Sequence, residues 1–272
     1  MLKPQRVVDL CCGAGLFSAG MERAGHRIIL GVDNNPIVLD SFQTNFPDAS
    51  VLEGDLMDLK HLPRCDVIIG GPSCQPFSMA NRNRNPETGM ALVEKFLDLV
   101  KNANPKYWIM EEVPPVADHI RGRVPRVEVW DCSSFGARNL RPRMFAGDFP
   151  DPVTTRPACE SPAPTVLASD MVTPIPELRD LQGIPSWFVL CGTERDQRQQ
   201  IGNGVPLETG EAFGRGIGYH LQGRGIGGHQ EWHTMGAAYY RQIGIPGKRA
   251  YLSCRKYRYC YHCDAYFPED SG

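Results

Sequence analysis

A cysteine between two prolines is the first candidate for chemistry in this sequence. The stretch GGPSCQPFS (70–78) follows the apolar run CDVIIG and places Cys74 in a rigid loop just after the end of a predicted strand. A structural thiol more often lies inside a strand, so we interpret Cys74 as an exposed nucleophile. The alternative is a cysteine that packs as a small hydrophobic side chain.

An acid and two arginines accompany the thiol. Glu111 comes near the end of the next predicted strand, KYWIMEEV, and the carboxyl ends of parallel strands meet at the edge where such folds bind ligands. A thiolate and a carboxylic acid on one edge suit covalent catalysis. Glu112 stands beside Glu111, which leaves open which of the two acts. Arg141 and Arg143 alternate as on a strand; they either hold a carbonyl oxygen or a phosphate, or form a solvated strand face.

A glycine loop precedes these residues in the chain. DLCCGAG predicts a strand, the glycines Gly13 and Gly15, and then a helix, a turn that lets backbone approach a ligand. Asp33 ends the next predicted strand and suits ribose hydroxyls, while Asp55 closes the third and could reach an adenine amino group. Because the next glycine is Gly20, the spacing departs from the dinucleotide pattern and favours S-adenosylmethionine.

The elements that must position these residues alternate between strands and helices, which predicts a Rossmann-like, doubly wound α/β fold. The sheet should be mostly parallel with helices on both faces, and a small irregular C-terminal region should follow. VPRVEVWDC and RPRMFAGDF predict further strands at the far edge of the sheet. Apolar runs predict strands within residues 6–15, 27–36, 50–56, 65–71 and 106–113, and helical spacing predicts helices at 16–25 and 89–105.

Composition limits the class of protein. The chain has 272 residues, 42% of them hydrophobic, which is enough for one large domain or for one domain with an appendage. No run of 18 apolar residues predicts a membrane span, and the N-terminal stretch resembles no secretory signal. We therefore expect a cytoplasmic protein, in which the ten cysteines are reduced. A net charge of −2 argues against a strongly basic surface but allows a local basic cleft.

Six blocks of the sequence together resemble the cytosine-C5 DNA methyltransferase family. DLCCGAGLFSAG resembles its cofactor loop, and GGPSCQPFS resembles its nucleophile loop, G-P-P-C-Q-P-F-S. EEV stands where the family has E-N-V, and RNLRPR where it has Q-x-R-x-R. PELRDLQGIP and QIGNGVP are similar to two late motifs. The blocks keep the family's order from about residue 5 to residue 217.

The resemblance implies a DNA (cytosine-5-)-methyltransferase that uses S-adenosylmethionine. It implies that Cys74 adds to C6 of a flipped-out cytosine, that Glu111 contacts N3 and the exocyclic amine, and that Arg143 holds O2 with support from Arg141. Ser73, Gln75, Ser78, Arg82 and Arg84 are the expected substrate-binding residues, the two arginines as a grip on phosphate. The expected cofactor-binding residues are Asp9, Cys11, Gly13, Gly15, Leu16, Phe17, Asp33, Asn34, Asp55, Leu56, Pro72, Asn203 and Val205.

Four single residues depart from the family pattern. Ser73 replaces a proline, Glu112 an asparagine and Asn139 a glutamine. Cys11 stands where many relatives place an aromatic residue against adenine, which predicts weaker cofactor binding. None of these changes removes a group that the chemistry needs.

A larger departure concerns target recognition. We divide the chain into a cofactor-binding catalytic core (1–147), a reduced recognition or connecting segment (148–175), late motifs that return to the core (176–217) and a tail (218–272). The second segment is too short for an independent recognition domain. Three explanations stay open: relaxed specificity on DNA, recognition by the tail, or a smaller substrate. The alternatives to DNA methylation are therefore the same chemistry on RNA or a free cytosine nucleotide, and a non-catalytic nucleic-acid-binding relative.

The tail contains SCRKYRYCYHCDAYF (253–267), in which basic and aromatic residues alternate. Such a composition suits contact with a nucleic-acid backbone and stacking on bases, as it also suits the charged face of a small subdomain. Its candidate ligands for a structural zinc are Cys254, Cys260, His262 and Cys263; free thiols are the equal alternative. We expect a monomer that binds DNA and no membrane, either nucleoid-associated or, if viral, in the host cytoplasm.

Overall fold

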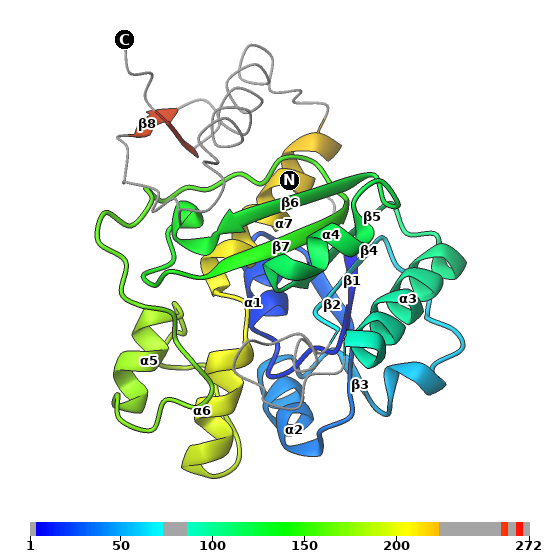
Figure 1. Ribbon diagram of the computed structural model, residues 1–272, viewed down its shortest axis with the longest axis horizontal. Coiled ribbons are helices and arrows are strands. Elements are labelled where there is room, and N and C mark those ends of the chain that lie inside the picture. The colour runs from blue at the N-terminus through cyan, green and yellow to red at the C-terminus, as the bar shows by residue number, and fades with distance from the viewer. Residues whose placement is uncertain (1–3, 73–85, 223–256, 261–264, 269–272) are drawn as a thin grey trace.

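The computed structural model describes residues 4–72, 86–222, 257–260 and 265–268 of the chain (Figure 1). Its main sheet has the strand order β3-β2-β1-β4-β5-β7-β6, in which the first five are parallel and β7 is antiparallel to both of its neighbours. The predicted Rossmann-like α/β fold and its two extra edge strands are confirmed. The strands are β1 (Arg6–Leu10), β2 (Arg27–Asp33), β3 (Ser50–Glu53), β4 (Val67–Gly70), β5 (Tyr107–Glu112), β6 (Arg126–Asp131) and β7 (Pro142–Asp148).

Helices connect these strands and follow them. Asn35 caps the second helix, because its side chain accepts a hydrogen bond from the backbone N–H of Ile37 at 3.0 Å. The α-helices are α1 (Leu16–Arg23), α2 (Pro36–Asn45), α3 (Pro86–Ala103), α4 (Ala117–Ile120), α5 (Ile175–Leu181), α6 (Glu194–Asn203) and α7 (Leu207–Leu221). Short 3-10 turns are η1 (Leu56–Asp58), η2 (Pro114–Val116) and η3 (Cys132–Phe135).

Two buried apolar clusters cover the two faces of the sheet. Successive side chains of a strand point to opposite faces, so Ile109 and Met110 of β5 belong to different clusters. The first cluster includes Phe17 of α1 and Phe213 of α7, and the second includes Phe96 of α3. The sheet is therefore a middle layer between α1 and α7 on one face and α3 on the other.

The contact between α1 and α7 depends on a glycine. A Cβ atom at Gly20 would lie 2.5 Å from both the backbone nitrogen of Glu211 and the carbonyl oxygen of Leu207. No real Cβ atom approaches backbone so closely, so only glycine allows this separation of the helices. In this way α7 is held against α1, the helix that follows the glycine loop.

The segment between β7 and α5 has few regular elements, as predicted. It contains no helix or strand; an isolated bridge joins Asn139 to Ala163, and an ion pair joins Asp151 to Arg126 of β6 at 2.6 Å. In the tail, β8 (Tyr257–Cys260) and β9 (Ala265–Pro268) form an antiparallel pair. None of the helices within the described ranges is long and apolar enough to cross a membrane. The four domain boundaries stay a prediction.

Candidate active site

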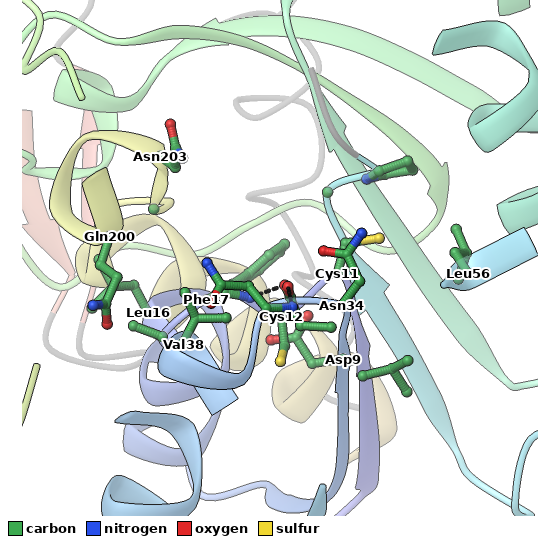
Figure 2. A pocket seen from close by; sticks show the side chains of 18 of the residues that line it. Asp9, Cys11, Cys12, Leu16, Phe17, Asn34, Val38, Leu56, Gln200 and Asn203 are labelled. Carbon is green, nitrogen blue, oxygen red and sulfur yellow. Dashed lines mark hydrogen bonds between the residues drawn. The ribbon is translucent and has the colours of Figure 1, made fainter. Parts of the chain in front are cut away.

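A cavity of about 300 Å³ lies at the carboxyl ends of the first strands. It gathers side chains from α1, from the turns after β1 and β2, and from α6, as Figure 2 shows. Its size is at the lower end of the range for small-molecule sites. All thirteen predicted cofactor-binding residues line it except Gly15, and the cavity lining also includes Glu111.

The glycine loop forms the floor of this cavity. Cys11, Gly13 and Gly15 all have positive φ angles, of 57°, 53° and 89°. A Cβ atom at Gly13 would meet nothing within 4 Å, so this part of the backbone is open to the cavity. Gly15 instead packs against the ring of Phe46, 2.5 Å from where its Cβ would be, which explains why it lies outside the lining. The left-handed backbone at Cys11, a residue with a side chain, is a locally strained conformation.

Asp33 ties the glycine loop to the end of β2. Its Oδ2 accepts a hydrogen bond from the backbone N–H of Gly13 at 2.9 Å, and its Oδ1 accepts one from Asn35 at 3.0 Å. Burial raises the pKa of Asp33, and these backbone hydrogen bonds oppose that shift. Each carboxylate oxygen retains a further acceptor site that can face a ligand.

Two other acids line the same cavity. Asp55 lies beyond the end of β3, which it was expected to close, and its Oδ1 accepts a hydrogen bond from the backbone N–H of Met57 at 2.9 Å at the start of η1. Asp9 is buried within β1, and its Oδ2 accepts a hydrogen bond from the hydroxyl of Ser18 at 2.7 Å. Burial raises the pKa of Asp9 to about 7, although that hydrogen bond opposes the shift.

Glu111 and Arg143 form an ion pair at the edge of the cavity. The Nε of Arg143 on β7 lies 2.8 Å from Oε1 of Glu111 on β5. Glu111 is only 8% exposed, so it is not a surface charge. A Cβ atom at Gly71 would lie 3.0 Å from the other oxygen of Glu111, Oε2, so this carboxyl group faces the end of β4.

Arg141 has different partners from Arg143, although the sequence predicts that both face one side. It lies just before β7, is 1% exposed, and donates to the carbonyl oxygens of Gly202 at 2.9 Å and Val166 at 3.3 Å. The interpretation of a solvated strand face is therefore wrong for Arg141. The reason is that two chain segments distant in sequence fold over it and offer backbone acceptors.

A buried amide network holds the wall of the cavity that carries Asn203, and the sequence interpretation missed it. The Nε2 of Gln182 donates to the carbonyl oxygen of Ile201 at 2.7 Å, and the Nδ2 of Asn139 donates to the Oε1 of Gln182 at 3.2 Å. Gln182 and Asn139 are both fully buried. The signal in the sequence was the glutamine within the late motif PELRDLQGIP, which was read only as a family resemblance.

Further lining residues also escaped the sequence interpretation. They lie on α2, α3 and α6, where helical periodicity marks them only as amphipathic positions. They include Ile37, Val38, Leu92, Asp196, Gln199 and Gln200.

Several predicted site residues lie outside the described residues. These are the nucleophile Cys74 and the substrate-binding candidates Ser73, Gln75, Ser78, Arg82 and Arg84. The zinc candidates Cys254, His262 and Cys263 also lie outside, and Cys260 is described only as the end of β8. Within the part of the chain that is described, no group of three or more His, Cys, Asp or Glu side chains could hold a metal ion. The zinc site is not supported by any contact.

Comparison with known proteins assigns a family to this fold and cavity. Residues 5–136 match the family model of the C-5 cytosine-specific DNA methylases. Over these 132 of its 272 residues, the chain is similar to that family. The matched stretch contains the glycine loop, Asp33, Asp55 and Glu111, all of which line the cavity.

Curated proteins similar to this chain include Type II methyltransferases. M1.HphI of Haemophilus parahaemolyticus is 34% identical over 181 residues, which are 54% of this chain and 49% of that protein. M.AquIA of Picosynechococcus sp. is 31% identical over 131 residues, 44% of this chain and 52% of that protein. The chain thus spans about half the length of these relatives.

Solved structures share the fold of the chain. A candidate DNA modification methyltransferase encoded within an E. coli prophage superposes with a TM-score of 0.65 at 19% identity, covering 80% of this chain and 99% of that one. The S. pombe Dnmt2 methyltransferase superposes with a TM-score of 0.56 at 13% identity, covering 76% and 96%. At such identities the likeness concerns architecture alone.

Proposed function

We propose that this protein transfers the methyl group of S-adenosylmethionine to C5 of cytosine in DNA. The observation that carries the proposal is one cavity in which the glycine loop, Asp33 and Asp55 meet Glu111, itself paired with Arg143. Binding groups for an adenosine and a buried acid–arginine pair thus share one edge of the sheet. The match of residues 5–136 to the family model suggests the reaction class for this arrangement.

The cavity residues fit S-adenosylmethionine in their chemistry. Asp33 offers two carboxylate oxygens already fixed by backbone hydrogen bonds, which suits a ribose with two hydroxyl groups. Val38 and Leu56 offer apolar surface for an adenine ring. Asn203, on the opposite wall at the end of α6, would lie beside the methionine end of the cofactor.

Cys74 would act as the nucleophile. Its thiolate adds to C6 of the cytosine, forming an S–C6 bond and shifting electron density to C5. When bound, S-adenosylmethionine would supply the electrophilic methyl group for this carbon, with its S–CH3 bond breaking to leave S-adenosylhomocysteine. Loss of the C5 proton to a base then restores the C5–C6 double bond and expels Cys74 as a thiolate. A base in duplex DNA must leave the stack to meet the thiol, at a cost of about a few kcal/mol.

The position of Glu111 suits stabilisation of that electron-rich ring. Its Oε2 faces Gly71, which precedes Cys74 by three residues in the sequence. Glu111 would bind N3 and the exocyclic amine, while Arg143 would hold O2 and fix the carboxyl group through the ion pair. Arg141 would support the pair indirectly, by holding the backbone at Gly202.

RNA or a free cytosine nucleotide is the second candidate substrate. The segment between β7 and α5 carries no helix or strand of its own, which favours a protein without a separate DNA-reading domain. The reaction and its residues would be unchanged.

The test is transfer of radiolabelled methyl from S-adenosylmethionine to duplex DNA, single-stranded DNA, transfer RNA and cytosine nucleotides, side by side. Label in DNA that disappears in Cys74→Ala, while cofactor binding persists, is the expected result. Label only in RNA or in nucleotides would mean that the substrate is not DNA, while the proposed reaction stays the same. No label in any substrate, with the cofactor bound, would favour a non-catalytic nucleic-acid-binding protein.

A further inference from the structure

Glu112 is a buried carboxyl group on β5, next in sequence to Glu111 of the candidate site. It is the last residue of β5, only 1% exposed, and as the neighbour of Glu111 on a strand it points to the opposite face of the sheet. Its Oε2 accepts a hydrogen bond from the backbone N–H of Val113 at 2.8 Å. Its Oε1 is buried and has no hydrogen-bond partner among the described residues.

A buried carboxylate is normally stabilised by an ion pair or by several donors, and Glu112 has one donor. The cation that acts on it is Arg143, whose Nε is engaged by Glu111 and whose Nη1 donates to the carbonyl oxygen of Pro142 at 2.8 Å. A negative charge on Glu112 would therefore compete with Glu111 for the same guanidinium group. It would also stand beside a second carboxylate in a site with little water.

Burial and the neighbouring acid both favour the neutral form of Glu112. Burial first, and then the carboxylate of Glu111, raise its pKa to about 8, against smaller opposing effects of the Val113 hydrogen bond and Arg143. From the end of β1, the neighbouring ionisable group is the half-buried thiol of Cys11, whose own pKa is raised by desolvation and by acids that include Glu112. Among the described residues, Arg143 is the positive charge that interacts with Glu112.

We propose that Glu112 is a positioning residue that works as a neutral carboxylic acid, with its proton on Oε1 and its Oε2 fixing the backbone where β5 ends. In this form Glu112 does not compete with Glu111 for Arg143. It also holds the backbone of Val113, at the end of β5, through its hydrogen bond. The catalytic part of this inference rests on the proposed function. Loss of the proton would place an unpaired charge behind Glu111 and loosen the end of β5.

The first test needs no catalysis. Between its ordinary value of 4.5 and about 8, Glu112 keeps its proton in the folded chain and loses it in the unfolded chain, so stability falls as pH rises through this window. The unfolding equilibrium constant should change by up to about tenfold per pH unit from this group. Glu112→Gln, which has the shape of the neutral form, should remove that dependence in denaturant titrations from about pH 6 to about pH 9.

Glu53→Gln, which changes an exposed carboxyl group on β3, is the matched control and should follow the wild type. The infrared carbonyl band of a protonated carboxyl group should be present in the wild type at neutral pH and absent from Glu112→Gln. If that band is missing, or if Glu112→Gln and wild type lose stability in parallel, the proposal is wrong.

A second test concerns positioning. Methyl transfer by the wild type should decline about tenfold from neutral pH to about pH 9, because about one tenth of Glu112 would then keep its proton. Glu112→Gln should retain the rate at the alkaline end, with an unchanged dissociation constant for S-adenosylmethionine. An identical alkaline decline in both proteins would contradict a positioning role. Should neither protein methylate any substrate, the proposed function fails, while the infrared and stability measurements still decide the state of Glu112.

Discussion

The acids of the site differ in what surrounds each carboxyl group, and this difference assigns them different tasks. Asp33 accepts backbone hydrogen bonds on both oxygens and faces the cavity. Glu111 shares one oxygen with Arg143 and turns the other toward the end of β4. Glu112 is buried with a single donor. From these surroundings we expect Asp33 to bind the ligand, Glu111 to act in catalysis and Glu112 to stay neutral.

The first prediction concerns Asp33 and the cofactor. Asp33→Ala removes both the acceptor for ribose hydroxyls and the contact that fixes Gly13, so the affinity for S-adenosylmethionine should fall about 10- to 100-fold. Calorimetric titration would measure this. Asp58→Ala changes an exposed acid of the nearby turn η1 and should bind as the wild type does. If wild type and Asp33→Ala bind S-adenosylmethionine with equal affinity, Asp33 is not part of the cofactor site.

At the scale of elements, the site depends on helices that hold loops in place. The helix α7 packs on α1 at Gly20, and α1 begins at the glycine loop that forms the floor of the cavity. The amide network of Asn139 and Gln182 ties the end of α6 to the loop before β7. Residues that touch no ligand can therefore move cavity walls.

Gly20→Ala tests the first of these contacts. Alanine favours a helix over glycine by about 1 kcal/mol, so propensity alone predicts stabilisation. Because the added Cβ would meet the backbone of α7 at 2.5 Å, we expect instead a loss of about 1–3 kcal/mol in the free energy of unfolding. Gly54→Ala, where an added Cβ meets nothing within 4 Å, is the control in the same denaturant titration. A stabilised Gly20→Ala would show that the helices can separate at little cost.

Gln182→Ala tests the amide network. It leaves the carbonyl oxygen of Ile201 without its donor in a buried setting, which should cost about 1–3 kcal/mol of stability. The affinity for S-adenosylmethionine should fall as well, because Asn203 and Val205 line the cavity next to that carbonyl group. Glu177→Ala, an exposed change on α5, should affect neither quantity. Full cofactor affinity in Gln182→Ala would mean that the wall holds its shape without the network.

At the scale of the whole molecule, sequence patterns predict those features that depend on residues close together in the chain. Apolar runs and the glycines that follow them mark the strand ends, and all but one of the expected cofactor residues meet at one cavity. Contacts with carbonyl groups far along the chain carry no local signal. The bonds from Arg141 to Val166 and Gly202, 25 and 61 residues away, could not be read from an alternating pair of arginines. The burial of Glu112 likewise depends on packing that two adjacent acids do not reveal.

The length of the chain bears on how it finds a target. It spans about half of its curated relatives, and the segment between β7 and α5 adds no helix or strand to the fold. Recognition by the Cys- and Tyr-rich tail and recognition through relaxed specificity both stay predictions. Either would leave the covalent chemistry at Cys74 unchanged, so that chemistry is the central claim to test.

The most direct measurement uses duplex DNA synthesised with 5-fluoro-2′-deoxycytidine in place of 2′-deoxycytidine. Fluorine at C5 cannot leave as a proton does, so an enzyme that adds its cysteine to C6 is trapped on the DNA after methylation. We expect a complex that survives denaturation, forms only with S-adenosylmethionine, and carries its adduct on the peptide containing Cys74. Cys74→Ala should bind the cofactor and form no complex. Methylation of ordinary DNA without trapping, or trapping through another of the ten cysteines, would contradict the account.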